Sequence, residues 1–285
     1  MAIDISIIIV SWNVCDRLQE NLKALFENCR DIEFEVFIVD NNSHDDTVLM
    51  IEKNYPLVKI IKNDKNLGFA RANNQGIKLA QGRYILLLNP DMRTELNTVK
   101  CMVEWMDNNP KAGVAGCHLI DENGKTIKHI RRFPMMSDQL AVILKIPHLY
   151  PKVLNQYLCM DFDYTKEQEV DQVRGSFFMI RKEVIKKIGG LDERYFIWFE
   201  EVDYCRQVKL AGWKVMYTPA AQCIDYVGQS FSKIASFKKQ CYFRDSMLKY
   251  FKKWHSFSEY FILYIFWPFA FLITAIFLIF KKNNE

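Results

Sequence analysis

The chain has 285 residues, of which 50% are hydrophobic and 25% charged, a composition that excludes a disordered or low-complexity protein. This length suits one catalytic-sized domain with an appendage. The net charge of +4 is mild, but basic residues gather just before the last apolar run, which favours contact with anionic lipid over nucleic acid.

The first 112 residues alternate between strand and helix patterns. Short apolar runs typical of buried strands are followed by segments with apolar residues at helical spacing. Such alternation predicts right-handed βαβ units, and therefore an α/β fold with a mostly parallel sheet, helices on both faces and a nucleotide-binding character. The expected strands span residues 5–13, 34–43, 58–63 and 84–91, and the expected helices span residues 17–29, 45–55 and 68–80.

The N-terminus and the cysteines both indicate a cytoplasmic catalytic domain. The segment "MAIDISIIIV" has no basic leader before its apolar residues, so we expect a first strand rather than a signal peptide. The eight cysteines form no CxxC pair and no spacing typical of zinc sites, so we expect reduced thiols.

The second half of the chain has a less regular pattern. A strand at about 112–120 precedes a long stretch of weak periodicity. Residues 175–196 then predict a strand and a helix, and residues 200–219 predict a helix followed by a last strand. We expect a nucleotide-binding half at 1–115 and an acceptor half at 116–250.

Residues 251–285 form the expected appendage to a catalytic domain over residues 1–250. An uncharged run at 260–280 is long enough, as a helix, to cross a hydrocarbon core of roughly 30 Å, and Pro268 would kink it. One interpretation is a spanning or re-entrant helix that holds the protein at the cell inner membrane; the alternative is a buried hairpin or an oligomer-forming helix. The basic residues before this run are Lys233, Lys238, Lys239, Arg244, Lys249, Lys252 and Lys253.

Two strands end on carboxylates. The run "YILLL" stops at Asn89-Pro90-Asp91, because Pro90 cannot donate a ladder hydrogen bond, and Asp91 therefore emerges at the carboxyl end of a strand, where open α/β sheets bind ligands. Asp40 ends the second strand and could accept a hydrogen bond from a ribose or a base. The alternatives are a turn role for Asp91 and, for the residues after Asp40, a helix cap.

The chain has no GxGxxG and no GxxxxGK[ST] motif, which argues against a dinucleotide site or a P-loop. The phosphates of a bound nucleotide would then need another cation. A divalent metal on Asp91 is the natural candidate, because Mg²⁺ is commonly held by one or two carboxylates together with substrate phosphates.

An acidic group opens the helix expected from residue 200. One explanation is that carboxylates are stabilised by the positive end of the helix dipole, which would apply to Glu200, Glu201 and Asp203. However, the preceding "YFIWF" is strongly aromatic, and desolvation there would raise a carboxyl pKa toward the range useful for a catalytic base.

Taken together, these motifs resemble the family 2 inverting glycosyltransferases, in particular the bacterial rhamnosyltransferase-like branch. The resemblance covers roughly residues 4 to 250 and implies a GT-A fold, a nucleotide-sugar donor such as a dTDP- or UDP-sugar, and Mg²⁺ or Mn²⁺. The motifs that carry it, in order, are "SIIIVSWN", "VDNNSHDDT", "NKNLGFARANNQGIKLAQGRYILLLNPD", "GSFFMIRKEVIKKIGGLDERYFIWFEEVDYCRQVKLAGW" and a downstream "GQS".

The resemblance also implies roles for individual residues. Asp91 would match the last Asp of an Asp-x-Asp signature that ligates the metal and the ribose-diphosphate, with Asn89 at the first position. Glu201 would be the catalytic base, with Glu200 or Asp203 as substitutes. The residues implied to hold the donor are Ser11, Trp12, Asn13, Asp40, Asn66, Gly68, Phe69, Arg71, Asn74, Asn89 and Asp91.

The chain departs from the family pattern at two positions. Glu201 stands where Asp is more common, and Asp225 stands where the family usually has a metal-completing His. Asp225 could ligate a hard cation or could mean a different donor pocket. We therefore expect sugar transfer to a lipid-linked or cell-surface glycan, with a non-catalytic, membrane-anchored sugar-nucleotide-binding scaffold as the alternative. A nucleotidyltransferase is disfavoured, because "SWNVCDRLQE" lacks a Gly-rich, basic loop.

Overall fold

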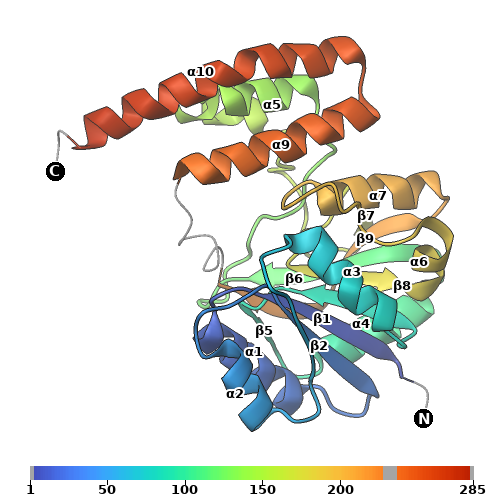
Figure 1. Ribbon diagram of the computed structural model, residues 1–285. Coiled ribbons are helices and arrows are strands. Elements are labelled where there is room, and N and C mark those ends of the chain that lie inside the picture. The colour runs from blue at the N-terminus through green and yellow to red at the C-terminus, as the bar shows by residue number, and fades with distance from the viewer. Residues whose placement is uncertain (1–2, 227–235, 283–285) are drawn as a thin grey trace.

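The computed structural model describes residues 3–226 and 236–282, with side chains to residue 272, and is built around one mixed β-sheet (Figure 1). The strand order is β3-β2-β1-β4-β8-β6-β9-β5, with β7 paired to β9. The strands are β1 (Ile5–Ser11), β2 (Phe34–Asp40), β3 (Lys59–Lys62), β4 (Tyr84–Leu88), β5 (Met92–Thr94), β6 (Ala112–Ile120), β7 (Gln168–Glu169), β8 (Phe177–Arg181) and β9 (Lys214–Asp225).

The first half confirms the predicted alternation, and the second half makes the sheet a mixed one: β6 and β9 pair in parallel, as expected, but the other pairs there are antiparallel. Strands β1 to β4 pair in parallel, as βαβ units require. In contrast, β8 runs antiparallel to both β4 and β6, and β9 pairs antiparallel with β5 and β7. The β4–β8 register sets Leu88 opposite Phe177, so the chain after β4 meets the chain before β8.

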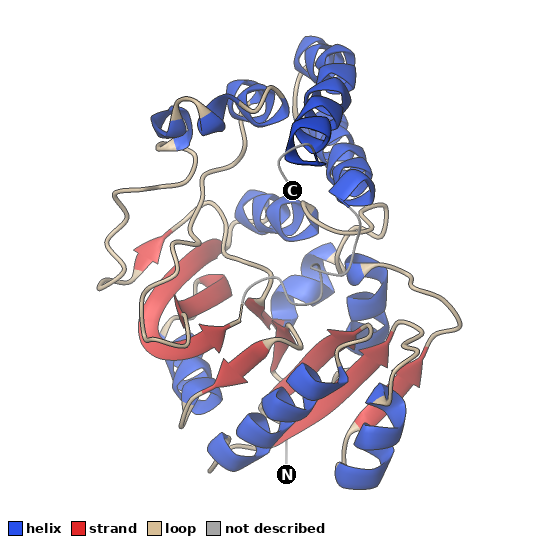
Figure 2. Ribbon diagram, turned by 90° about the vertical axis from the view of Figure 1, so that its left-hand side faces the viewer, coloured by secondary structure: helices blue, strands red, loops and turns tan. Residues whose placement is uncertain are grey.

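Helices cover both faces of the sheet, as expected (Figure 2). Apolar side chains of α1, α2 and α4 pack in one buried cluster, and those of α3, α6 and α7 pack in a second cluster on the other face. The sequence pattern did not identify α4 or β5. The bounds are α1 (Cys15–Asn28), α2 (Thr47–Asn54), α3 (Phe69–Leu79), α4 (Thr98–Asn108), α6 (Lys182–Ile188) and α7 (Glu200–Leu210).

A separate helical unit lies over the α7 side of the sheet (Figure 1). It consists of α5 (Met136–Ile143), α9 (Ser236–Trp254) and α10 (Phe257–Lys282), joined by a third apolar cluster that includes Phe199 and Val202. Two short 3₁₀ turns, Ile146–His148 and Pro151–Leu154, follow α5.

Helix α10 corresponds to the apolar run for which a membrane span was one expectation. In the described part of the chain, no helix combines the length and the apolar character that crossing a membrane requires. Leu263, Trp267 and Ala270 are buried against the helical unit, as the alternative of a packed helix expects. The second half of the run, 273–280, has no described side chains.

Candidate active site

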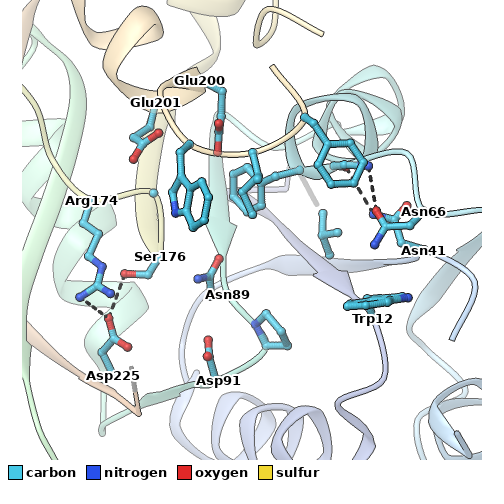
Figure 3. Close-up of a pocket in the computed structure, with 18 residues that line it drawn as sticks. Trp12, Asn41, Asn66, Asn89, Asp91, Arg174, Ser176, Glu200, Glu201 and Asp225 are labelled. Atoms are coloured by element: carbon cyan, nitrogen blue, oxygen red, sulfur yellow. Dashed lines mark hydrogen bonds and ion pairs between the residues drawn. The ribbon is translucent and has the colours of Figure 1, made fainter. Parts of the chain in front are cut away.

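A cavity of about 210 Å³ opens at the carboxyl ends of β1 and β4, between the sheet and the start of α7 (Figure 3). Its position agrees with the rule that open α/β sheets bind ligands at the carboxyl ends of their strands. The predicted site residues that line it are Trp12, Asn66, Gly68, Phe69, Asn89, Asp91, Glu200, Glu201 and Asp225.

Asp40 and Ser11 lie side by side just behind the cavity lining. They are register partners at the ends of β2 and β1. One Asp40 oxygen accepts a hydrogen bond from the Ser43 N–H (2.9 Å), whereas Asp40 Oδ1 and Ser11 Oγ are buried and lack a hydrogen-bond partner among the described residues. Neither residue lines the cavity, so the structure does not bring the predicted nucleoside contacts of Ser11 and Asp40 to its surface.

Asn13 shapes the loop after β1. Its φ is +55°, and its Oδ1 accepts a hydrogen bond from the His44 N–H at 2.7 Å. Its own N–H donates to Ser43 Oγ at 2.9 Å. Asn13 therefore connects the loops that follow β1 and β2, and it does not line the cavity.

Asn41 organises the loop 63–68 beside the cavity, although sequence reasoning did not select it. Its Oδ1 accepts hydrogen bonds from the Leu67 N–H (3.3 Å) and from Asn63 Nδ2 (3.0 Å), while its Nδ2 donates to the Gly68 carbonyl (3.3 Å). Asn66 Oδ1 accepts from the Gly68 N–H at 2.9 Å. The sequence signal that could have identified Asn41 is its position directly after Asp40, the last residue of a strand.

Gly68 joins the loop 63–68 to the aromatic segment before α7. Its φ is +85°, and a Cβ at this position would collide with the Phe196 carbonyl oxygen. The Phe69 N–H donates to the same oxygen at 2.7 Å. Glycine is required here by both the backbone conformation and the close approach.

Asn74 and Arg71, both predicted to bind donor, point elsewhere. Asn74 is buried, accepts from the Leu191 N–H (2.9 Å) and donates to the Leu191 carbonyl (2.8 Å). Arg71 forms a 3.3 Å ion pair with Glu193. Both side chains attach α3 to the loop after α6, so neither lines the cavity.

Asp91 and Asp225 are brought together by the pairing of β5 with β9. Met92 is the register partner of Asp225, and the Tyr226 N–H donates to the Asp91 carbonyl at 3.1 Å. Both carboxylates are nearly fully buried and line the cavity (Figure 3). The "GQS" motif at 228–230 lies outside the described residues.

Arg174 is a cation that the sequence did not single out. Its Nη1 lies 3.2 Å from Asp225 Oδ2, which also accepts a hydrogen bond from Ser176 Oγ at 3.2 Å (Figure 3). The described residues contain no group of three or more His, Cys, Asp or Glu side chains arranged to hold a metal ion. Two carboxylates facing one cavity nevertheless fit a cation that takes its remaining ligands from a diphosphate and water.

Glu200 and Glu201 enter the cavity from the side opposite Asp91 (Figure 3). The two preceding residues, Trp198 and Phe199, have φ values of +63° and +66°. Left-handed backbone at two consecutive aromatic residues costs free energy, and such strain clusters at functional sites. The turn it creates directs both carboxylates into the cavity.

Burial raises the pKa of both glutamates. The pKa of Glu200 lies well above its ordinary value because of burial and the nearby charge of Glu201. The pKa of Glu201 is also raised by burial, while the positive charges of Arg131 and Arg174 oppose the shift. Each glutamate has a buried Oε2 with no hydrogen-bond partner in the part of the chain that the structure describes, so each can exchange a proton with a ligand.

Asp203 is fully buried but lies away from the cavity. Its oxygens accept hydrogen bonds from Trp254 Nε1 (2.6 Å), Lys253 Nζ (2.8 Å) and Gln207 Nε2 (2.7 Å). These contacts attach α9 to α7. The geometry therefore gives Asp203 a structural role and does not support it as a substitute base.

The sequence of this chain is similar to known glycosyltransferases. The family described as Glycosyl transferase family 2 matches residues 6–189. The N-acetylglucosaminyl-diphospho-decaprenol L-rhamnosyltransferase of Mycobacterium tuberculosis is 24% identical over 206 residues, which are 68% of this chain and 67% of that protein. Rhamnosyltransferase WbbL of Escherichia coli K12 is 26% identical over 230 residues, 77% of this chain and 82% of its own length.

Solved structures are similar in fold. A mannosyltransferase from Pyrobaculum calidifontis in complex with GDP-Man and Mn²⁺ matches 87% of this chain with a TM-score of 0.59 and 16% identity. TarS of S. aureus in complex with UDP-GlcNAc matches 85% with a TM-score of 0.56 and 17% identity. This chain spans 63% and 65% of those two chains, respectively.

Proposed function

Because the chain belongs to glycosyl transferase family 2, we propose that it transfers a sugar with inversion from a nucleotide-diphosphate donor to a hydroxyl of a lipid-linked or cell-surface glycan. The observation that carries this proposal is that one cavity is lined both by Asp91, at the end of a buried strand, and by Glu201, at the start of α7. A donor and an acceptor can therefore meet between a diphosphate-binding side and a proton-accepting side.

The relatives support a donor and an acceptor class. Two relatives are named as rhamnosyltransferases, and one of these names describes a diphospho-decaprenol acceptor. Rhamnose from a dTDP- or UDP-linked donor and a lipid-linked acceptor are therefore the substrates to test first. Trp12 and Asn66, which line the cavity, would contact the nucleoside, with Asp40 and Ser11 buried behind the lining.

In the proposed mechanism, Glu201 acts as general base. Its carboxylate removes the proton of the acceptor hydroxyl while the hydroxyl oxygen attacks the anomeric carbon. The bond from that carbon to the diphosphate oxygen breaks on the opposite face, and its electron pair leaves with the nucleotide diphosphate. Attack from the face opposite the leaving group inverts the anomeric configuration.

Asp91 and Asp225 would hold a divalent cation against the donor diphosphate. When bound, Mg²⁺ or Mn²⁺ offsets the negative charge that develops on the leaving group. Arg174 adds a second positive charge on the same side of the cavity, 3.2 Å from Asp225.

We place the catalytic domain at the cytoplasmic side of the cell inner membrane. The support is the apolar helix α10 and the basic residues of α9, which would bring the cavity close to a lipid-linked acceptor.

One observation favours the alternative of a non-catalytic binding protein. Arg174 forms an ion pair with Asp225 and so occupies a carboxylate that would otherwise be a ligand of the metal. In that case the cavity would bind a sugar nucleotide without turnover.

The test is a thermal-shift panel of UDP-, dTDP- and GDP-sugars, with and without Mg²⁺ or Mn²⁺, on the wild type and Asp91→Asn. A bound ligand raises the melting temperature by mass action. We expect one nucleotide class to stabilise the wild type in a metal-dependent manner, and Asp91→Asn to lose the metal dependence. No shift with any sugar nucleotide would contradict the proposed function, whereas a shift without sugar transfer would favour the binding protein.

A further inference from the structure

A second cavity of about 230 Å³ lies in the helical unit, between α5, α9 and α10. Most of its wall is apolar, supplied by residues such as Ile143, Phe243, Trp267 and Ala270. We refer to it as the helical cavity. It is separate from the donor-binding strand ends, and the proposed transfer chemistry does not use it.

Side chains that carry nitrogen donors interrupt this apolar wall: Lys145, Lys239, Gln240, Trp198 and Trp267. Lys145, just after α5, and Lys239, in α9, both line the helical cavity. Trp267 is 3% exposed, and its Nε1 has no hydrogen-bond partner among the residues with described positions. A buried N–H without an acceptor costs about 1–3 kcal/mol, so its presence at a cavity wall points to a ligand that brings an oxygen.

The helical cavity and the candidate active site share one residue. Trp198 lines both, and it lies two residues before Glu200 in the strained turn that opens α7. A molecule held in the helical cavity therefore has one end next to the tryptophan that borders the proposed base.

We propose that the helical cavity binds the acceptor, by the phosphate-bearing head and first carbons of a long-chain lipid. The apolar wall suits the hydrocarbon, and the lysines with the indole N–H suit the oxygens of a phosphate or diphosphate. The sugar attached to that head would pass Trp198 and reach the cavity of Glu201. This inference rests on the proposed function for the identity of the acceptor, and it adds the site that would hold it.

The exposed side of α10 supports a lipid rather than a soluble anion. Phe261, Ile265 and Phe269 are each 46–49% exposed and follow one another at helical spacing on the same helix that supplies Trp267. An exposed apolar row of this kind suits contact with hydrocarbon, which a free phosphate does not supply.

The test uses farnesyl diphosphate, a short isoprenoid diphosphate, as the probe, with binding to the full chain measured by calorimetry. Farnesol and inorganic pyrophosphate are the comparison ligands. We expect farnesyl diphosphate to bind more tightly than either, because only it satisfies both the apolar wall and the cations. Lys145→Gln/Lys239→Gln should weaken its binding roughly 10- to 100-fold, and Trp267→Phe should weaken it about fivefold.

The matched control is Lys252→Gln, because Lys252 is an exposed lysine of α9 that does not line the helical cavity. Each variant is also tested for thermal stabilisation by the sugar nucleotide found in the panel above, which reports folding and donor binding. Equal binding of pyrophosphate, or equal loss in the control, would overturn the proposal. So would a wild type that binds sugar nucleotide but not farnesyl diphosphate, and that result would leave the proposed function standing. Binding of neither ligand would contradict both.

Discussion

Glu201 is the side chain on which the proposed chemistry depends. Glu201→Gln keeps the shape of the side chain but removes the proton acceptor, so we expect kcat to fall by about 10²- to 10⁴-fold while the donor still binds. Because burial raises the pKa of Glu201, activity should fall on the acid side at a pH above the ordinary carboxyl range. A pH–rate profile measures this limb.

The control for Glu201 is Glu183→Gln. Glu183 is likewise in the first turn of a helix, α6, but is exposed and distant from the cavity lining. It should leave kcat unchanged. If Glu201→Gln kept full activity, the base would have to be another group and the interpretation of the α7 start would be wrong.

Glu200 should make stability depend on pH. Its pKa is raised well above the ordinary value by burial and by Glu201, so the protonated form is favoured in the folded state. That contribution is complete below the pKa of the unfolded chain and is lost as pH rises through the folded pKa. The side chain in Glu200→Gln cannot ionise, so this variant should not lose that stability. The free energy of unfolding of the variant minus that of the wild type should therefore increase from pH 4 to pH 8. Denaturant titrations at several pH values measure this, and parallel curves would show that Glu200 is not desolvated.

At the scale of elements, the loop 63–68 beside the cavity depends on Gly68. Gly68→Ala places a Cβ against the Phe196 carbonyl and keeps a positive φ, and it should lower both the unfolding midpoint and donor affinity. Gly124→Ala is the matched control, because Gly124 has a φ of +75° but nothing within 4 Å of its would-be Cβ. Both substitutions place a side chain at a positive φ, and Gly68, with φ +85° and ψ 176°, lies in a region that essentially only glycine adopts, at a cost of roughly 1–3 kcal/mol. An equal loss in the two variants would show that the contact with Phe196 is unimportant.

Asp203 should hold α9 in place rather than take part in catalysis. Asp203→Ala leaves the Trp254 indole and the Gln207 amide without their acceptor and removes one of the two carboxylates that bind Lys253, the other being Asp192. The cost should be roughly 3 kcal/mol in the free energy of unfolding. The control is Asp245→Ala, an exposed i,i+4 pair with Lys249 that should cost under about 0.5 kcal/mol. Denaturant unfolding compares them. If Asp203→Asn folded stably but lost kcat alone, the catalytic interpretation would return.

Sequence reasoning succeeded where the signal is local and failed where the partner is distant. The alternation of the first half, the strand end at Asp91 and the acidic start of α7 are all visible in short windows of sequence. The antiparallel insertion of β8 between β4 and β6 is not visible in this way, because a short apolar run does not indicate which strand it pairs with. Arg174 was overlooked for the same reason: its importance comes from Asp225, which lies on another strand.

At the scale of the whole molecule, the active-site cavity lies between two units, the sheet and the helical unit. The sheet supplies the donor side through strand ends, and the helical unit fixes the turn that carries Trp198 and the acidic pair. The same α10 that buries Trp267 inside this unit leaves a row of apolar side chains outside it. If the protein binds a bilayer as proposed, this outer row of α10 is the surface that would enter the interface.

That orientation predicts which surface binds membranes. Replacing the exposed α10 residues Phe261, Ile265 and Phe269 by Ser should abolish sedimentation with vesicles that contain anionic lipid, because it removes apolar area that would otherwise enter the interface. The same number of Ser substitutions at Leu49, Leu57 and Leu79, which are also exposed but lie on other elements, should leave sedimentation unchanged. Donor binding should persist in both variants, since neither set lines the active-site cavity. Equal sedimentation of the two variants would mean that α10 does not face the bilayer, and the exposed row would then be better explained as a contact between copies of the chain.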